Sequence, residues 1–160
     1  MPKLSAGLLL YRVRDGVVEV LIAHPGGPFW ARKDDGAWSI PKGEYTPGDD
    51  PWVAAQREFE EEVGSAPSVG PRIELGPVKQ PGGKVVTAFA APGDLDPADA
   101  VSNSFELEWP RGSGQLRSFP EIDRVAWFPV AQARAKLLKG QLPLLDQLMA
   151  DPSLAGRRES

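Results

Sequence analysis

The chain has 160 residues, of which 41% are hydrophobic and 25% charged, so it is long enough for one globular domain with a buried core. Its net charge of −4 argues against a general nucleic-acid-binding surface, because phosphate backbones are bound mainly by clustered Lys and Arg. The absence of cysteine excludes disulfides and thiolate metal sites. The apolar run in residues 1–13 is too short for a signal peptide or a membrane span, so we expect a cytoplasmic protein without a membrane segment.

The chain begins with two predicted strands. Residues 4–13 and 17–23 are rich in strand-forming side chains and are separated by an Asp-Gly pair, which predicts a hairpin with a tight turn. Residues 25–36 then form a long loop of polar and aromatic residues, followed by a short strand that leads to Lys42. Loops of this length in a compact domain are often functional, so this loop is a candidate for substrate contact.

Several side chains in and after this loop are candidates for nucleotide binding. Phe29, Trp30 and Trp38 could stack on a nucleobase. Arg32, Lys33 and Lys42 could face phosphates. For the aromatic residues, ordinary packing is the competing interpretation.

Two further residues near the loop have mainly structural interpretations. His24 is the only histidine, and capping of a strand end is favoured over substrate contact or catalysis. Trp38 lies in a predicted strand, where packing in the core is the favoured role.

Residues 43–64 combine a Gly/Pro-rich loop with an acidic helix. Asp50 followed by Pro51 is typical of a helix start, because the Asp side chain accepts free amide protons of the first turn and proline has no amide to satisfy. Gly64 is typical of a left-handed cap residue at a helix end. The pattern predicts a helix over 51–63.

The predicted helix carries an apolar stripe and, beside it, an acidic stripe. Four apolar residues share one face: Trp52, Ala55, Phe59 and Val63. Glu58, Glu61 and Glu62 share the adjacent flank, where like charges three and four residues apart repel each other. Arg57 can reach Glu61 at i+4, but one guanidinium does not neutralise three carboxylates. Mg²⁺ is commonly bound by a few carboxylates together with substrate phosphates, so pyrophosphate chemistry is indicated, with a solvated acidic face as the competing interpretation.

A second hairpin is predicted after the helix. Residues 72–80 and 84–91 are strand-like and flank a Pro-Gly-Gly turn. Lys84 at the start of the second strand could face the site, and a solvated strand end is its competing interpretation. Residues 92–100 form a polar loop, and 104–109 alternate apolar and acidic residues as a half-exposed strand does.

The last part of the chain is predicted to close the fold. Residues 111–123 have the Gly, Ser and Pro content of a loop, and 124–129 form a final strand. Two short helices are expected over 130–138 and 142–150. The tail over 151–160 is expected to be disordered.

The acidic segment resembles the Nudix box, G-x5-E-x7-R-E-U-x-E-E-x-G-U, in which U is aliphatic or aromatic. Seven positions match at the required spacings: Gly43, Arg57, Glu58, Phe59, Glu61, Glu62 and Gly64. Asp49 stands in place of the first glutamate, and Ser65 in place of the last apolar residue. The stretches SAGLLLYR, HPGGPFWARKDDGAWSIPKGE and FPEIDRVAWF are similar to a bacterial branch of the family near diadenosine tetraphosphate hydrolases and nucleoside triphosphate pyrophosphohydrolases.

This resemblance implies an α/β/α sandwich with a mixed β-sheet and a loop-helix-loop catalytic motif, as a single Nudix domain over residues 1–150. It implies hydrolysis of a nucleoside diphosphate linked to another group, X, with the help of Mg²⁺ or Mn²⁺. The implied metal ligands are the side chains of Glu58, Glu61 and Glu62 and the backbone carbonyl of Lys42.

The resemblance also implies roles for the remaining site residues. Arg57 would hold the helix carboxylates in place, and either Glu58 or Glu121 would take the proton from the attacking water. Glu121 precedes a late strand ending in Trp, where family members often carry an additional acidic residue. Simple exposure of this loop carboxylate to water is the competing interpretation.

The substrate is the least determined part of the prediction. A dinucleoside polyphosphate such as diadenosine tetraphosphate is the leading candidate, and a nucleoside triphosphate or nucleotide sugar is the alternative. A Nudix-like domain that senses a nucleotide without cleaving it is the competing class, disfavoured because every acidic residue of the REUxEE core is present. The expected partner is a small-molecule nucleotide, without nucleic acid or membrane, and the sequence does not indicate an oligomeric state.

Overall fold

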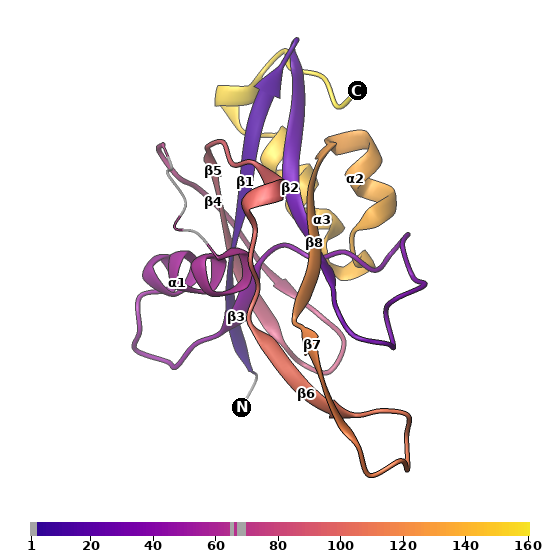
Figure 1. Ribbon diagram of the computed structural model, residues 1–160. Helices are drawn as coiled ribbons and strands as arrows, with labels where there is room; N and C mark the ends of the chain where they lie inside the picture. The colour runs from indigo at the N-terminus through magenta and orange to yellow at the C-terminus, as the bar shows by residue number, and fades with distance from the viewer. Residues whose placement is uncertain (1–2, 65, 67–69) are drawn as a thin grey trace.

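A six-stranded mixed sheet forms the centre of the computed structural model, which describes residues 3–64, 66 and 70–160 (Figure 1). Its strands are β1 (Leu4–Arg14), β2 (Val17–Pro25), β3 (Lys42–Glu44), β4 (Ile73–Lys79), β5 (Val85–Pro92) and β8 (Ile122–Pro129). They are ordered β4-β5-β1-β2-β8, and β3 pairs with β1. The pairing of β1 with β5 is parallel, whereas the other pairings in this sheet are antiparallel. Strand β8 therefore lies at an edge of the sheet.

Helices cover both faces of this sheet. Helix α1 (Pro51–Val63) packs on one face, while α2 (Val130–Lys136) and α3 (Leu142–Met149) pack on the other (Figure 1). Strand β1 shows why, because Leu8 points to the α1 side and Leu9 to the α2 and α3 side, as alternation along a strand requires. The sandwich and its mixed sheet confirm the predicted fold class. In the ranges that the structure describes, no helix is both long and apolar enough to cross a bilayer.

Helix α1 has the predicted bounds, and local interactions account for both ends. The side chain of Asp50 accepts a hydrogen bond from the backbone N–H of Trp52 at 2.9 Å. Gly64 ends the helix in the left-handed region with φ 88°, and a β-carbon there would lie 2.2 Å from the carbonyl oxygen of Val101. Phe59, on the apolar stripe, is fully buried. Ser65, the last position of the Nudix box, lies outside the described residues.

One strand was missed in the sequence. Residues 111–123 were predicted as a loop, but β7 (Leu116–Pro120) lies within them and pairs antiparallel with β6 (Ser104–Glu108). Phe105 and Phe119 face each other across this pair, so β7 is stabilised by its pairing with β6. The Gly and Ser content of residues 111–123 is typical of a loop and gives no sign of this pairing. The two strands form an arm that projects from the main sheet in Figure 1.

The prediction of a disordered tail over 151–160 is wrong. The tail contains a short 3-10 helix, η3 (Pro152–Leu154), and Leu154 is buried. The carbonyl of Arg158 accepts a hydrogen bond from the N–H of Val18 at 2.9 Å. Because these contacts join the tail to residues far away in the chain, local sequence pattern does not reveal them.

Candidate active site

The C-terminal half of α1 carries four carboxylates, at Glu58, Glu60, Glu61 and Glu62. The carbonyl end of a helix carries a partial negative charge, so acidic side chains are disfavoured there. The last turn of α1 contains no basic residue to offset them. This concentration of negative charge therefore requires compensation from outside the helix.

Glu58 is held against the strand that precedes the helix. Its side chain is 15% exposed, and a β-carbon on Gly43 would lie 2.0 Å from its Oε2 atom, so only glycine leaves room for it. Burial and then the charge of Glu61 raise the pKa of Glu58, while Arg57 acts in the opposite direction. The Nη2 atom of Arg57 lies 3.5 Å from Oε1 of Glu58. The ion pair of Arg57 is thus with Glu58, which corrects the predicted pair with Glu61.

Glu62 is the most strongly perturbed carboxyl group of the helix. Its Oε2 atom accepts a hydrogen bond from the backbone N–H of Lys42 at 3.2 Å. Burial raises the pKa of Glu62 to about 7, although the Lys42 N–H and charge act to lower it. The negative charges of Glu58 and Glu121 add to the rise. Glu62 is therefore a half-buried carboxyl group whose ionisation is opposed mainly by burial, with Lys42 as its main favourable neighbour.

Glu121 reaches this cluster from a different part of the chain. It lies just before β8, is exposed, and lines a 190 Å³ cleft together with Lys42 and Glu62. Its backbone N–H donates to the carbonyl of Asn103 at 2.7 Å, and its carbonyl accepts from the N–H of Gly26 at 2.9 Å. These two backbone hydrogen bonds, to Asn103 and to Gly26, hold Glu121 beside the helix carboxylates.

Lys42 also lines this cleft, and Lys84 lies within electrostatic reach of Lys42. The pKa of Lys42 is lowered, first by burial and then by the positive charge of Lys84. Glu62 and Glu44 act in the opposite direction. Lys84 is therefore close enough to Lys42 for the two cations to repel each other beside the acidic cluster.

Glu61 is placed differently from the other two predicted metal ligands. It is exposed and lines a separate cleft of 460 Å³ with Arg57 and Glu60. Among residues 3–64, 66 and 70–160, no three acidic or histidine side chains lie close enough together to hold a metal ion as they stand. The structure thus brings Glu58, Glu62 and Glu121 within electrostatic reach of one another, and the exposed Glu61 at the rim also acts on Glu58.

The donor set nevertheless suits a divalent cation. Carboxylate oxygens are the ligands that Mg²⁺ and Mn²⁺ prefer. The raised pKa values of Glu58 and Glu62 mean that both carboxylates would gain from a nearby positive charge. These two residues therefore supply oxygen donors of the type that such an ion prefers.

The predicted aromatic contacts lie away from this cluster. Phe29 is 54% exposed, and its ring meets Trp109 edge to face with centroids 5.5 Å apart. Trp30 is half-buried against the core on the α2 and α3 side. Neither residue lines the clefts that contain Glu62.

His24 and Trp38 are structural, in line with the favoured interpretations. His24 is 4% exposed, and its Nδ1 atom lies 2.8 Å from Oδ1 of Asp123. Its Nε2 atom contacts the carbonyl of Lys33. Trp38 is fully buried. Arg32 lies near this pair, in a cleft that also contains Arg124.

Sequence reasoning did not single out Asp123, Arg124, Ser102 or Asn103. Ser102 accepts a hydrogen bond from the N–H of Ile122 at 2.9 Å, next to the Asn103 contact that holds Glu121. The alternation of residues 124–129 could have placed Arg124 on one face of its strand, but nothing in the sequence indicates which segments meet it.

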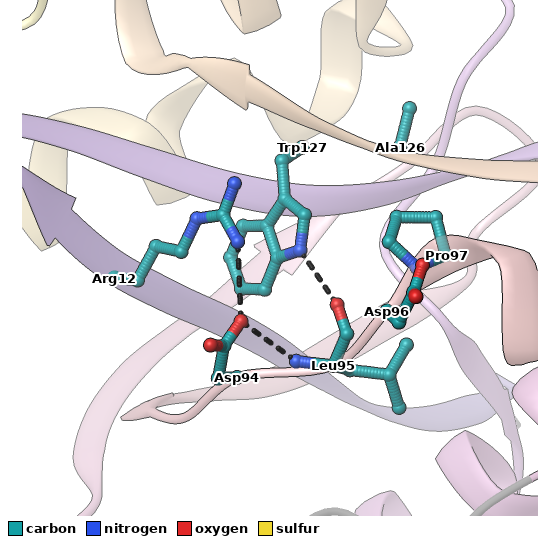
Figure 2. A pocket seen from close by; sticks show the side chains of 7 residues that line it. All are labelled: Arg12, Asp94, Leu95, Asp96, Pro97, Ala126 and Trp127. Atoms are coloured by element: carbon teal, nitrogen blue, oxygen red, sulfur yellow. Dashed lines mark hydrogen bonds and ion pairs between the residues drawn. The ribbon is translucent and has the colours of Figure 1, made fainter.

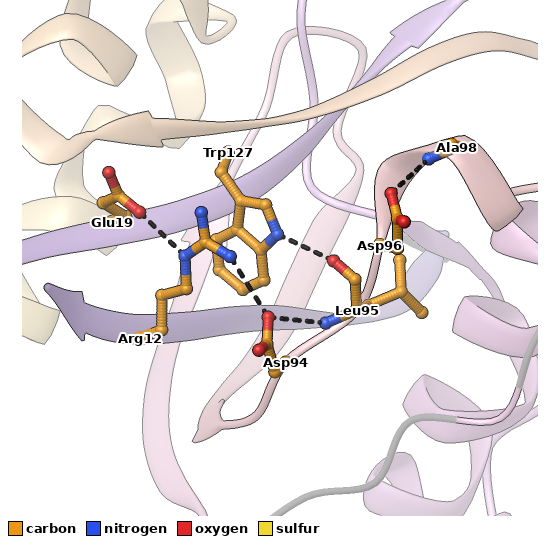
Figure 3. A network of polar contacts seen from close by, with 7 residues as sticks. All are labelled: Arg12, Glu19, Asp94, Leu95, Asp96, Ala98 and Trp127. Carbon is orange, nitrogen blue, oxygen red and sulfur yellow. Dashed lines mark hydrogen bonds and ion pairs between the residues drawn. The ribbon is translucent and has the colours of Figure 1, made fainter.

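A wide cleft of 640 Å³ lies elsewhere on the α1 side (Figure 2). Several of the polar groups that line it already bond to other protein groups. Arg12 lies 4.2 Å over the ring of Trp127, and its Nε and Nη1 atoms bond to Glu19 at 2.7 Å and Asp94 at 3.1 Å (Figure 3). The indole N–H of Trp127 donates to the carbonyl of Leu95 at 2.9 Å. This Arg12–Trp127 network fastens the segment after β5 to the sheet.

Comparisons with known proteins agree with the geometry. The family model described as NUDIX domain matches residues 1–148. An RNA pyrophosphohydrolase of Rhodospirillum rubrum is 47% identical over 66 residues, which cover 40% of this chain and 39% of that protein. An asymmetrical bis(5'-nucleosyl)-tetraphosphatase of Caenorhabditis elegans is 40% identical over 59 residues, which cover 37% of this chain and 38% of that protein. The matched part is therefore less than two fifths of the length of either curated relative.

A solved structure shows the same fold. The crystal structure of C. elegans Ap4A hydrolase superposes with a TM-score of 0.59 at 22% identity, covering 94% of this chain and 98% of that chain. At this identity the likeness concerns the arrangement of sheet and helices alone.

Proposed function

The chain belongs to the Nudix family, and from this premise we propose that it is a metal-dependent pyrophosphohydrolase acting on a nucleoside diphosphate linked to a further group. The leading substrate class is the dinucleoside polyphosphates, such as diadenosine tetraphosphate, with nucleoside triphosphates and nucleotide sugars as alternatives. The observation that carries the proposal is the position of two half-buried carboxyl groups: Glu58 lies against Gly43, and Glu62 accepts the backbone N–H of Lys42 in a cleft shared with Glu121.

Glu58 and Glu62 would hold Mg²⁺ or Mn²⁺, with Glu61 and the backbone carbonyl of Lys42 as the further ligands of the set. When bound, such an ion would neutralise the charge of the diphosphate and make its phosphorus more open to attack by water. Gly43 contributes by its lack of a side chain, since it lets Glu58 lie against β3. Arg57 contributes as a positioning residue, because it contacts the carboxylate of Glu58 from the exposed side of the helix.

The two lysines and the two candidate bases have distinct tasks. Lys42 lies beside Glu62, Lys84 lies within electrostatic reach of Lys42, and both would attract the phosphates of the substrate. Either Glu58 or Glu121 would take the proton from the attacking water. Glu58 is only 15% exposed and lies against Gly43, which fixes the position of its carboxylate for proton transfer. Glu121 is exposed beside the same cleft and can reach a water molecule directly.

The pH–rate profile of a variant separates the two bases. The fall of kcat at low pH reports protonation of the general base. If Glu58 is the base, this fall should persist in Glu121→Gln. If the fall disappears in Glu121→Gln, the base is Glu121.

A phosphate-release screen tests the proposed function. The purified protein is incubated with Mg²⁺ or Mn²⁺ and diadenosine polyphosphates, nucleoside triphosphates, ADP-ribose and nucleotide sugars. We expect metal-dependent release that is fastest with diadenosine tetraphosphate and is abolished by EDTA. Tight nucleotide binding without turnover of any substrate would instead identify a nucleotide-sensing domain.

The R. rubrum relative makes RNA carrying a 5'-triphosphate a necessary further substrate in this screen. The net charge of −4 disfavours binding of a long phosphate backbone, so we expect no turnover of this RNA. Turnover of the RNA in preference to the small nucleotides would overturn the proposed substrate class while leaving the proposed pyrophosphate chemistry intact.

A further inference from the structure

A second cleft, of 450 Å³, lies beside the edge strand β8, on the side of the sheet away from α1. It is lined by His24, Ala31, Arg32, Lys33, Asp34, Asp123 and Arg124. Arg124 packs over Trp38, which belongs to the core on the α2 and α3 side. Figure 1 shows the loop between β2 and β3 next to β8 and α2, with α1 on the opposite side. We call this feature the basic cleft.

Among the described residues, the three cations of the basic cleft lack a direct carboxylate partner, although Arg124 lies within electrostatic reach of Asp34. In the part of the chain that the structure describes, neither Arg32, Lys33 nor Arg124 forms an ion pair. The guanidinium carbon of Arg124 lies 4.8 Å from the centre of the Trp38 ring, and Nζ of Lys33 lies 5.1 Å from the centre of the Trp30 ring. Stacking on a ring orients a cation but leaves its charge and its N–H donors available to an anion.

The two carboxylates in the basic cleft are engaged with other groups. Asp34 accepts hydrogen bonds from Nζ of Lys136 at 2.5 Å and from the indole N–H of Trp38 at 2.8 Å. Asp123 bonds to His24 at 2.8 Å. The cleft therefore presents net positive charge in a chain whose overall charge is −4.

The basic cleft adjoins the acidic cluster. Asp123 and Arg124 also line a 140 Å³ cleft that contains Glu62. Glu62 in turn shares a cleft with Glu121 and Ile122. Moving along β8 from Ile122 to Arg124 covers about 7 Å at the usual rise of a strand. A ligand that is anionic along its length can therefore extend from Glu62 across the edge of the sheet into the basic cleft.

We propose that Arg32, Lys33 and Arg124 bind the distal phosphates of a long-chain nucleotide while its cleaved pyrophosphate lies at Glu58 and Glu62. This rests on the proposed function and deepens it, because the basic cleft then selects substrates by the length of their phosphate chain. A substrate with a single pyrophosphate occupies the acidic cluster alone, whereas a dinucleoside tetraphosphate or pentaphosphate also engages the three cations.

Steady-state kinetics on two substrates test this selection. Arg32→Gln and Arg124→Gln are compared with Arg14→Gln, an exposed arginine at the far end of β1 that also forms no ion pair in the described ranges. We expect the first two variants to raise KM for diadenosine tetraphosphate about tenfold, the effect of losing one charged hydrogen bond, with kcat little changed. KM for ADP-ribose, which has one pyrophosphate, should stay at the parental value.

A control variant and melting temperatures test whether a change in KM arises from loss of charge in general or from a perturbed fold. Arg14→Gln should leave both KM values unchanged, because it removes the same charge far from the basic cleft. The melting temperature of each variant shows whether loss of the Arg124 contact with Trp38 perturbs the fold, and Arg32→Gln tests the cleft without touching that ring. An equal rise in KM for both substrates, or no rise for diadenosine tetraphosphate, would overturn the proposal.

A binding measurement separates failure of this proposal from failure of the proposed function. Inorganic tripolyphosphate is titrated into the protein by calorimetry in the presence of EDTA, so that neither metal nor turnover is needed. We expect one saturable site that weakens with added salt and loses about tenfold or more in affinity in the Arg32→Gln/Arg124→Gln double variant. Equal affinity for parent and double variant refutes the basic cleft even in an active enzyme, and the expected loss in a protein without activity supports the cleft while refuting the hydrolase.

Discussion

Two polar clusters on the α1 side of the sheet have opposite electrostatic character. In the Arg12–Trp127 network, opposite charges meet, since the guanidinium of Arg12 bonds to two carboxylates and covers an aromatic face (Figure 3). In the acidic cluster, like charges meet, and burial raises the pKa values of Glu58 and Glu62. The first cluster is satisfied by the protein itself, whereas the second is suited to a positive ligand. The cleft at the satisfied network, of 640 Å³, is nevertheless larger than the 190 Å³ cleft beside the acidic cluster.

The largest expected effect is on catalysis by the acidic cluster. Glu58→Gln and Glu62→Gln should each lower kcat by about a thousandfold, within the usual range for loss of a catalytic carboxylate. Their melting temperatures should not fall, because each change removes a repelled charge. Initial rates with diadenosine tetraphosphate and Mg²⁺, and thermal unfolding curves, provide the measurements.

Glu60→Gln is the matched control, since Glu60 is an exposed carboxylate on the same helix and should be dispensable. Glu61→Gln, at the rim, is also expected to keep the fold and lose most turnover. A Glu61→Gln enzyme as active as its parent would count against Glu61 as a metal ligand, and parental activity in Glu58→Gln would remove the acidic cluster from the mechanism.

The second effect is on stability and its pH dependence. An unfolded chain ionises Glu62 near pH 4.5, but the folded protein does so at about 7. Between these values the folded state binds more protons, so in EDTA the stability should fall as pH rises, by roughly 3 kcal/mol in total at 1.4 kcal/mol per pKa unit. Urea unfolding at pH 5 and pH 8 measures the fall.

Glu62→Gln should flatten this pH dependence, because the amide has no proton to lose. Mg²⁺ should also reduce the fall in the parent protein, since it favours the ionised carboxylate. Identical pH dependence in the parent and in Glu62→Gln would show that Glu62 is not held as a buried carboxyl group.

The smallest effect is expected in the satisfied network. Arg12→Gln should lower the free energy of unfolding by about 1–2 kcal/mol, because it removes one ion pair with little exposure and a stacking contact. Trp127→Phe, which loses the hydrogen bond to Leu95 and leaves a smaller ring beneath Arg12, should cost about 1 kcal/mol or more. Both should retain kcat near the parental value. A loss of kcat in Arg12→Gln comparable to that of Glu58→Gln would mean that the wide cleft belongs to the active site.

The success of the sequence predictions follows the range of the interactions involved. The bounds of α1 were predicted because Asp50 and Gly64 act within one helical turn of its ends. Strand β7 was missed because it depends on pairing with β6, and the ordered tail was missed because its partners lie on β2. The predicted Arg57 pair with Glu61 was wrong although both possible partners are local, because the guanidinium turns to the adjacent Glu58.

By itself the sequence determined the family motif, the helix that carries it and the flank on which its acidic residues lie, because caps and helical periodicity are local. Only the tertiary structure decided which carboxylates are buried, that Glu121 faces Glu58 and Glu62, and that Arg32 and Arg124 share a cleft. Burial and charge pairing arise where distant segments meet, and the pKa of a carboxyl group depends on those neighbours more than on its place in the helix.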